Sequence, residues 1–267
     1  MKSIQELFDV QRPVALVTGS GSPRVGNAIA WRLARRGFSI VLHCNTSIDH
    51  ARTTAAEMTA EGTEVLIVQG AMDDADDVAR MFQEIDDRFA RIDVLVNSAA
   101  IWSPKRLEDV TADDVRKNLE VNTLGTFIAA QAAGLRMVRQ SHGGAIVNIG
   151  DWAVVRPYVD YAAYFPSKGA IPAMTRSLAL ELAQRNRFVR VNAILPGPVL
   201  LGSEVSDEVE AANRESTLLK RVGTAEHVAH AVEFLIENDF VTGTCLNVDG
   251  GRAIYAGDPM QIEHRTD

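Results

Sequence analysis

Cysteine is scarce in this chain of 267 residues, basic residues are fewer than acidic ones, and each of these features argues against a class of protein. The two cysteines, Cys44 and Cys245, lie far apart in the sequence, so neither a disulfide framework nor a cysteine-based metal site is expected. The chain has 35 acidic against 27 basic residues, whereas nucleic-acid binding depends on clustered cations. A secretory signal and an apolar run long enough to cross a bilayer are also missing. We therefore expect a cytoplasmic protein with no nucleic-acid or membrane partner.

Short apolar segments alternate with longer amphipathic ones along the whole chain. Apolar residues recur at helical spacing in the longer segments, as in a helix expected near 74–90. This alternation predicts an α/β fold, a single Rossmann-type doubly wound domain with a seven-stranded parallel sheet flanked by helices. The short segments are rich in valine and isoleucine, which is typical of strands buried on both faces. These predicted strands are 14–18, 38–43, 64–69, 92–97, 145–150, 189–194 and 244–249.

A glycine-bearing turn, TGSGSPRVGNAIA at 18–30, directly follows the first predicted strand and opens a helix. Glycine permits a tight turn and a close approach of the backbone, and a helix N-terminus offers free N–H groups to an anionic pyrophosphate. We therefore predict a dinucleotide site that includes Gly19, Ser20, Arg24, Val25 and Gly26.

The end of the second predicted strand indicates which dinucleotide binds. Sites for NAD(H) place a carboxylate there to accept from the ribose hydroxyls, but this chain has none before Asp49. Small polar residues stand there instead, and Arg24 adds a cation unless it is only a solvated loop residue. These features favour NADP(H) over NAD(H). The small polar residues are Asn45, Thr46 and Ser47.

Tyr164 is the tyrosine that a lysine follows at helical spacing, four residues later at Lys168. The two side chains would share one face of a helix. The ammonium should lower the pKa of Tyr164 from its usual value of about 10, as acid–base catalysis requires.

Together these segments resemble the short-chain dehydrogenase/reductase family over nearly the whole chain. The resemblance implies that Tyr164 and Lys168 are the catalytic pair and also contact the cofactor, and that Asn122, in VNTLGTF, holds a helix kink and a proton-relay water. It further implies that two segments line the cofactor, one after the fourth predicted strand and one after the sixth. The residues concerned are Asn97, Ser98, Ala99, Pro196, Gly197 and Val199.

Asp151 departs from the family pattern, because it lies thirteen residues before Tyr164, where the family has a catalytic serine. This aspartate, LHCNTS at 42–47 and Arg24 resemble the pteridine reductase branch, including dihydromonapterin reductases. The resemblance implies that Trp102, Asp151 and Tyr164 bind substrate, with Trp102 stacked on a pterin and Asp151 accepting from its ring N–H groups. The alternative hypothesis, that the protein is a carbonyl reductase in which this aspartate has arisen by neutral drift, stays open.

The predicted function is thus an NADP(H)-dependent oxidoreductase that transfers a hydride from nicotinamide to a small molecule, with a pterin-like heterocycle as the first substrate hypothesis. The alternative is a carbonyl reductase or secondary alcohol dehydrogenase, for example on a 3-oxoacyl substrate. A non-catalytic dinucleotide sensor or scaffold is the alternative of another class, although it would not need an acid–base pair. No metal is expected, because His227 and His230 lack a third ligand.

No break in composition divides the chain, so one NAD(P)-binding domain is expected over 1–267. Its core is 13–197, and 198–220 form an insertion that we predict to be a substrate lid, because ligands bind beyond the carboxyl ends of parallel strands. Residues 221–251 supply the last helix and strand, and 252–267 form a tail. Predicted helices at 126–138 and 170–183 are apolar on more than one face, which predicts a homo-oligomer, a tetramer or a dimer.

Overall fold

A single sheet of seven parallel strands runs through the centre of the computed structural model, which describes residues 2–199 and 206–255. The strand order is β3-β2-β1-β4-β5-β6-β7, so the chain changes direction across the sheet between β1 and β4. All seven predicted strands are confirmed, with bounds that differ from the predicted ones by at most two residues. The strands are β1 Val14–Val17, β2 Ser39–Cys44, β3 Val65–Gln69, β4 Val94–Asn97, β5 Gly144–Ile149, β6 Val189–Pro196 and β7 Cys245–Val248.

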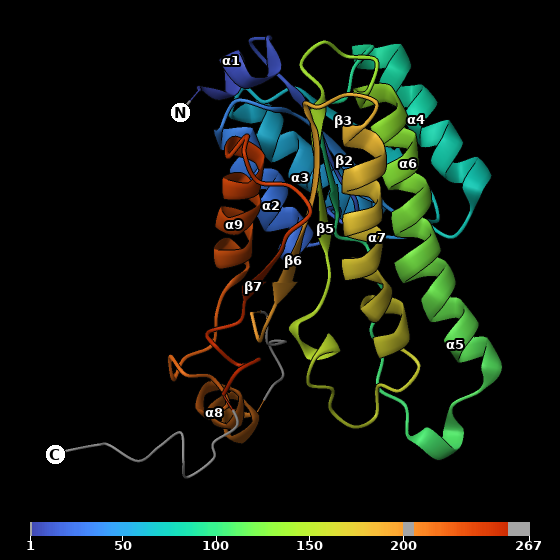
Figure 1. The fold of residues 1–267 in the computed structure, drawn as a ribbon, viewed down its shortest axis with the longest axis vertical. Coiled ribbons are helices and arrows are strands. Elements are labelled where there is room, and N and C mark those ends of the chain that lie inside the picture. The colour runs from blue at the N-terminus through green and yellow to red at the C-terminus, as the bar shows by residue number, and fades with distance from the viewer. Residues whose placement is uncertain (1, 200–205, 256–267) are drawn as a thin grey trace, which may run out of the picture.

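Helices cover both faces of the sheet, with α2 and α9 on one side and α4, α6 and α7 on the other (Figure 1). The helix expected near 74–90 is α4, and Asp74 caps its N-terminus by accepting from two backbone N–H groups. The α-helices are α1 Ile4–Phe8, α2 Val25–Arg35, α3 Ile48–Ala60, α4 Ala75–Phe89, α5 Ala112–Asn118, α6 Gly125–Met137, α7 Phe165–Ala183, α8 Asp207–Glu215 and α9 Ala225–Glu237. Within the described ranges, no helix has both the length and the apolar character that a membrane span requires.

Two apolar cores lie on opposite faces of the sheet, which explains why the strands are apolar throughout. Successive residues of a strand point to opposite faces. In β1, Ala15 and Val17 accordingly belong to the core beneath α2 and α9, while Val14 and Leu16 belong to the core beneath α4, α6 and α7. A strand with one solvated face would have shown alternating polar residues instead.

The predicted lid, 198–220, contains α8. Residues 200–205 of this insertion lie outside the described residues. The tail is described only as far as Tyr255. In Figure 1, α8 lies beyond the carboxyl ends of the strands, at the same end of the sheet as the loops that follow β5 and β6. This is the end at which parallel sheets bind ligands.

Candidate active site

The turn after β1 is held between the ends of β1, β4 and α2. Gly19 has a φ of +67°, and a Cβ there would lie 2.8 Å from Ala99 Cα, so glycine alone fits. A Cβ at Gly26 would lie 2.7 Å from the Gly19 carbonyl oxygen. Thr18 Oγ1 accepts from the N–H groups of Ser98 and Ala99 at 2.9 and 3.0 Å, which joins this turn to the segment after β4. Two of the predicted cofactor segments therefore meet here.

The N-terminus of α2 opens from this turn, and its first N–H groups, beginning at Val25 and Gly26, have no intrahelical partner. A backbone cradle that leaves no room for side chains, next to free amides at the positive end of a helix, fits a pyrophosphate. The geometry therefore supports the predicted phosphate site.

Arg24 is the N-cap residue of α2, and its exposed side chain makes no hydrogen bond or ion pair with the described part of the chain. Asn45 and Thr46 are exposed directly after β2, and Ser47 precedes α3. A Cβ at Gly21 would lie 3.1 Å from Ser47 Oγ, so the glycine turn packs against this segment. Small polar side chains thus lie at the end of β2, and Arg24 is the N-cap residue of the helix that the adjoining glycine turn opens; a 2′-phosphate site needs groups of both kinds.

Two of the predicted cofactor residues turn their side chains into the interior. Ser20 is fully buried, and its hydroxyl donates to the Val17 carbonyl at 2.7 Å and accepts from the His43 N–H at 3.1 Å. Asn97 donates from Nδ2 to Asn148 Oδ1 at 3.0 Å, between β4 and β5. Because both polar groups face the protein interior, these side chains shape the turn and the sheet, and a cofactor contact of either residue stays a prediction.

Tyr164 and Asp151 meet at the end of β5. Tyr164 directly precedes α7, and its hydroxyl donates to Asp151 Oδ2 at 2.9 Å. Asp151 Oδ1 accepts from the Ala153 N–H at 2.8 Å, which caps the 3₁₀ turn Trp152–Val154 and orients the carboxylate. The residue that replaces the family's serine is therefore in direct contact with the phenol.

Burial and the Asp151 carboxylate raise the pKa of Tyr164 well above its usual value. The prediction that Lys168 lowers this pKa is wrong for this arrangement, because a carboxylate faces the phenol while the Lys168 ammonium donates to the Ile149 carbonyl at 2.8 Å. Burial also raises the pKa of Asp151. Tyr164 consequently carries its proton at neutral pH, which suits a proton donor.

Lys168 lies one turn into α7, as predicted, and its side chain is buried. Burial lowers the pKa of its ammonium to about 8, against the opposing effect of Asp151. A lysine with this pKa exchanges its proton readily near neutral pH. Pro172, one turn further on, removes the N–H that would bond the Lys168 carbonyl, yet α7 continues through it to Ala183.

Asn122 lies in a π-helical turn, Leu119–Leu124, between α5 and α6, so the helix is irregular at the predicted position. Its Oδ1 accepts from the Ile101 N–H at 2.8 Å, and its Nδ2 donates to the Ile101 carbonyl and to Ser167 Oγ, each at 3.0 Å. Ser167 in turn donates to the Tyr164 carbonyl at 2.6 Å. Asn122 thus ties the loop after β4 to the first turn of α7, and its predicted proton-relay water stays a prediction.

Trp102 belongs to an aromatic cluster beside Tyr164, but Tyr161 lies between the two. The Trp102 ring stacks on Tyr161 with centroids 4.9 Å apart, and Tyr161 packs edge-on against Tyr164 at 6.2 Å. Trp102 Nε1 also donates to the Tyr158 hydroxyl at 3.4 Å, and the ring stays 55% exposed. Sequence reasoning missed Tyr158 and Tyr161, although the three-residue spacing from Tyr158 to Tyr161 and from Tyr161 to Tyr164 was a usable signal.

Arg252 is a second residue that the sequence did not indicate. Its guanidinium lies 4.5 Å from the centre of the Trp152 ring and donates to Asn213 Oδ1 of α8 at 3.0 Å. The opposite charge of Arg252 lowers the pKa of Asp151, although burial has the larger effect. Arg252 therefore links the predicted lid to the segment that carries Asp151.

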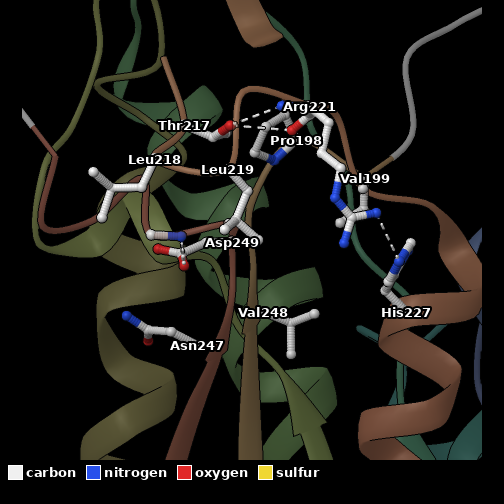
Figure 2. A pocket seen from close by; sticks show the side chains of 13 residues that line it. Pro198, Val199, Thr217, Leu218, Leu219, Arg221, His227, Asn247, Val248 and Asp249 are labelled. Atoms are coloured by element: carbon white, nitrogen blue, oxygen red, sulfur yellow. Dashed lines mark hydrogen bonds between the residues drawn. The ribbon is translucent and has the colours of Figure 1, made fainter. Parts of the chain in front are cut away.

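The loop after β6 packs against the end of β7. A Cβ at Gly197 would lie 2.6 Å from Asp249 Cα, so this contact requires glycine, and Pro196 is the last residue of β6. The next residues, Pro198 and Val199, help to line a cavity of about 390 Å³ together with residues 217–219, Arg221, Gly223, His227 and residues 247–251 (Figure 2). Among the described residues, no group of histidines, cysteines and acidic residues could hold a metal ion.

A doubly wound sheet with a glycine turn at its change of direction, and a tyrosine and lysine one helical turn apart, together define a dinucleotide-dependent oxidoreductase. The model of the family described as enoyl-(acyl carrier protein) reductase matches residues 23–253, and the chain belongs to this short-chain dehydrogenase/reductase family. NADP(H) as the cofactor is consistent with this family and with the site.

Relatives and a solved structure agree with this placement. A 3-oxoacyl-[acyl-carrier-protein] reductase of Synechocystis sp. is 34% identical over 91% of this chain and 97% of its own length. A protein of the same name from Rattus norvegicus is 32% identical over 88% of this chain and 96% of its own length. A crystal structure from Agrobacterium tumefaciens, described provisionally as a gluconate dehydrogenase, has a TM-score of 0.86 at 28% identity, and covers 94% of this chain and 99% of that one. These comparisons do not support the resemblance to pteridine reductases.

Proposed function

We propose that this enzyme is an NADP(H)-dependent reductase of a ketone carbonyl in an apolar substrate of the 3-oxoacyl type. The observation that carries the proposal is the buried Tyr164 hydroxyl, which Asp151 orients at the end of an aromatic cluster. The two relatives named as 3-oxoacyl-[acyl-carrier-protein] reductases support this substrate class over a pterin.

The residues of the site divide the work of carbonyl reduction. When bound, NADP(H) supplies the hydride for the carbonyl carbon. Tyr164 donates its proton to the carbonyl oxygen, so that the product is a secondary alcohol. Lys168, a buried ammonium whose pKa burial lowers to about 8, would replenish that proton after each turnover. Asn122 holds the loop after β4 and the start of α7 in fixed relation, which keeps the phenol in place.

Cofactor binding falls to the carboxyl ends of the strands. The glycine turn and the N-terminus of α2 would hold the pyrophosphate, and Arg24 with Asn45, Thr46 and Ser47 would hold the 2′-phosphate. The segments 97–99 and 196–199 border the same edge of the sheet and would line the nicotinamide half.

Exposed apolar side chains on the loops that carry the aromatic cluster suit the acyl part of such a substrate. Trp102, Val155 and Val159 are exposed by 55%, 66% and 82%, and they belong to the loops that carry the aromatic cluster. Exposed apolar groups gathered near a buried polar pair are typical of a substrate-binding surface. The insertion at 198–220 would cover this surface as a lid, with the Asn213–Arg252 hydrogen bond as one point of attachment.

The proposed substrate class is tested by following NADPH absorbance with three substrates: an acetoacetyl thioester, a simple ketone and a quinonoid dihydropterin. We expect kcat/KM for the thioester to exceed that for the pterin by at least about tenfold. Turnover of the pterin without turnover of either carbonyl compound would refute the proposal. NADPH binding without turnover of any of these substrates would favour a dinucleotide sensor.

The cofactor preference makes a separate prediction at Arg24. NADPH should bind at least about tenfold more tightly than NADH, and Arg24→Ala should remove most of that difference by weakening NADPH alone, since a charge-assisted hydrogen bond is lost. Titration of both cofactors by fluorescence measures the effect. Arg35→Ala, an exposed arginine near the other end of α2, is the matched control and should leave both affinities unchanged. Equal affinities in the wild-type protein would contradict the NADP(H) assignment.

We also propose that the enzyme forms a homo-oligomer and works in the cytoplasm. Leu135 of α6 and Leu180 of α7 are exposed by 44% and 64%, and both helices also bury apolar residues against the sheet. Helices that are apolar on two sides are typical of surfaces that pack against another subunit.

A further inference from the structure

His43, the penultimate residue of β2, lies buried beneath the glycine turn with both ring nitrogens in hydrogen bonds. Its Nδ1 is 2.9 Å from the Gly19 nitrogen, and its Nε2 is 3.0 Å from the Gly70 carbonyl oxygen. A backbone N–H can only donate and a carbonyl can only accept, so Nδ1 must be the acceptor and Nε2 must carry the proton. The ring is therefore neutral and held in one tautomer.

The backbone of His43 holds the next two residues of the same turn. Its carbonyl accepts from the N–H groups of Ser20 and Gly21 at 3.0 and 3.2 Å. The three consecutive N–H groups of residues 19–21 thus donate to His43 and are not available to a phosphate. The amides free for a pyrophosphate are those at the start of α2, and their direction depends on how the turn is held.

We propose that His43 is a positioning residue for the dinucleotide, whose imidazole holds Gly19 in the conformation that presents the N-terminus of α2 to the pyrophosphate. Gly19 is packed closely on two sides. A Cβ added to Gly19 would lie 2.8 Å from Ala99 Cα, and a Cβ added to Gly26 would lie 2.7 Å from the Gly19 carbonyl oxygen. A shift of Gly19 must therefore move the first turn of α2. The inference rests on the proposed use of a dinucleotide, but it assigns a role to a residue that contacts neither cofactor nor substrate.

Protonation of His43 would end this role, because a protonated Nδ1 is a donor facing the Gly19 N–H. Burial lowers the pKa of His43, and Asp77 of α4 opposes that effect. Asp77 itself accepts from the Ala71 N–H and pairs with Arg80, while the turn from Thr18 to Gly21 adds no titratable side chain. Dinucleotide affinity should therefore hold down to a pH below the usual histidine range and then fall as the pH drops further.

Two substitutions separate the two hydrogen bonds of the ring. In His43→Asn the amide oxygen takes the place of Nδ1, which keeps the acceptor for Gly19 and loses the bond to Gly70. In His43→Gln the amide nitrogen takes the place of Nε2, which keeps the bond to Gly70 and leaves the Gly19 N–H without a partner. We expect NADPH affinity, measured by fluorescence titration, to fall by about tenfold in His43→Gln, while His43→Asn stays within about threefold of wild type. The kcat at saturating NADPH should be unchanged in both.

Each variant loses one buried hydrogen bond, so both should have a similarly lowered Tm. The two variants should differ only in their affinity for NADPH. Equal affinities in the two variants, or weaker binding in His43→Asn, would overturn the proposal. A wild-type protein that binds no dinucleotide would instead overturn the proposed function. Should His43→Gln fail to fold, ¹⁵N spectra of the wild-type ring decide the matter: the Nε2–H tautomer and a fall in NADPH affinity that follows its protonation support the role, and an Nδ1–H tautomer contradicts it.

Discussion

Tyr164→Phe is expected to lower kcat by about 10²–10⁴-fold while changing NADPH affinity little. The substitution removes the transferable proton and keeps the ring, which packs against Tyr161 and Phe165. The effect should be large because burial and Asp151 keep the phenol of Tyr164 protonated, which suits its proposed role as the proton donor. Steady-state kinetics with an acetoacetyl thioester and fluorescence titration of NADPH measure the two quantities.

Tyr161→Phe is the matched control for this prediction. Tyr161 lies in the same aromatic cluster, three residues earlier, and its ring stacks on Trp102. Losing its hydroxyl should leave kcat within about threefold of wild type, since the ring contacts remain. A wild-type rate in Tyr164→Phe would show that another group supplies the proton.

Asp151→Ser is expected to raise kcat/KM for a ketone or 3-oxoacyl substrate by about tenfold. An ionised carboxylate can only accept hydrogen bonds, whereas a serine hydroxyl can donate one to the carbonyl oxygen of the substrate. The substitution also removes the carboxylate that raises the pKa of Tyr164. Kinetics with the same carbonyl panel and with a dihydropterin test it. Loss of pterin turnover without a gain on carbonyl substrates would favour the pterin hypothesis instead.

Asp151→Asn is the matched control, because it removes the charge, keeps the shape and can still cap the Ala153 N–H.

Since burial raises the pKa of Asp151, the ionised carboxylate lowers stability as the pH rises through the folded-state pKa. Asp151→Asn should therefore have the higher Tm at neutral pH, and the difference should shrink as the pH falls. The measured quantity is the Tm of Asp151→Asn minus the Tm of the wild-type protein. A difference that is smaller at neutral pH than at about pH 4 would contradict the raised pKa of Asp151.

The sequence carried enough information for the sheet because local pattern and tertiary burial agree there. All seven strands were recognisable from continuous apolar runs, since both faces of the sheet are covered. The glycine turn and the Tyr164–Lys168 pair were likewise recognisable, because a strand-to-helix turn and one turn of helix are local geometries. The sequence could not show that the side chains of Ser20 and Asn97 face inward, since the partners of a polar group depend on strands far away in sequence.

The residues of this chain by themselves determined the fold class, the order of the strands along the chain, and the one-turn spacing of the proposed acid–base pair, because each follows from periodicity or from short spacing. Only the tertiary structure decided the protonation of that pair. The pKa of Tyr164 depends on burial and on a carboxylate thirteen residues away, because the hydroxyl donates to Asp151 while the Lys168 ammonium donates to the Ile149 carbonyl. The same holds for His43, which is unremarkable in sequence. Its proposed role appears only when β2 comes to lie beside β1, because a buried N–H needs an acceptor and the imidazole of His43 supplies it.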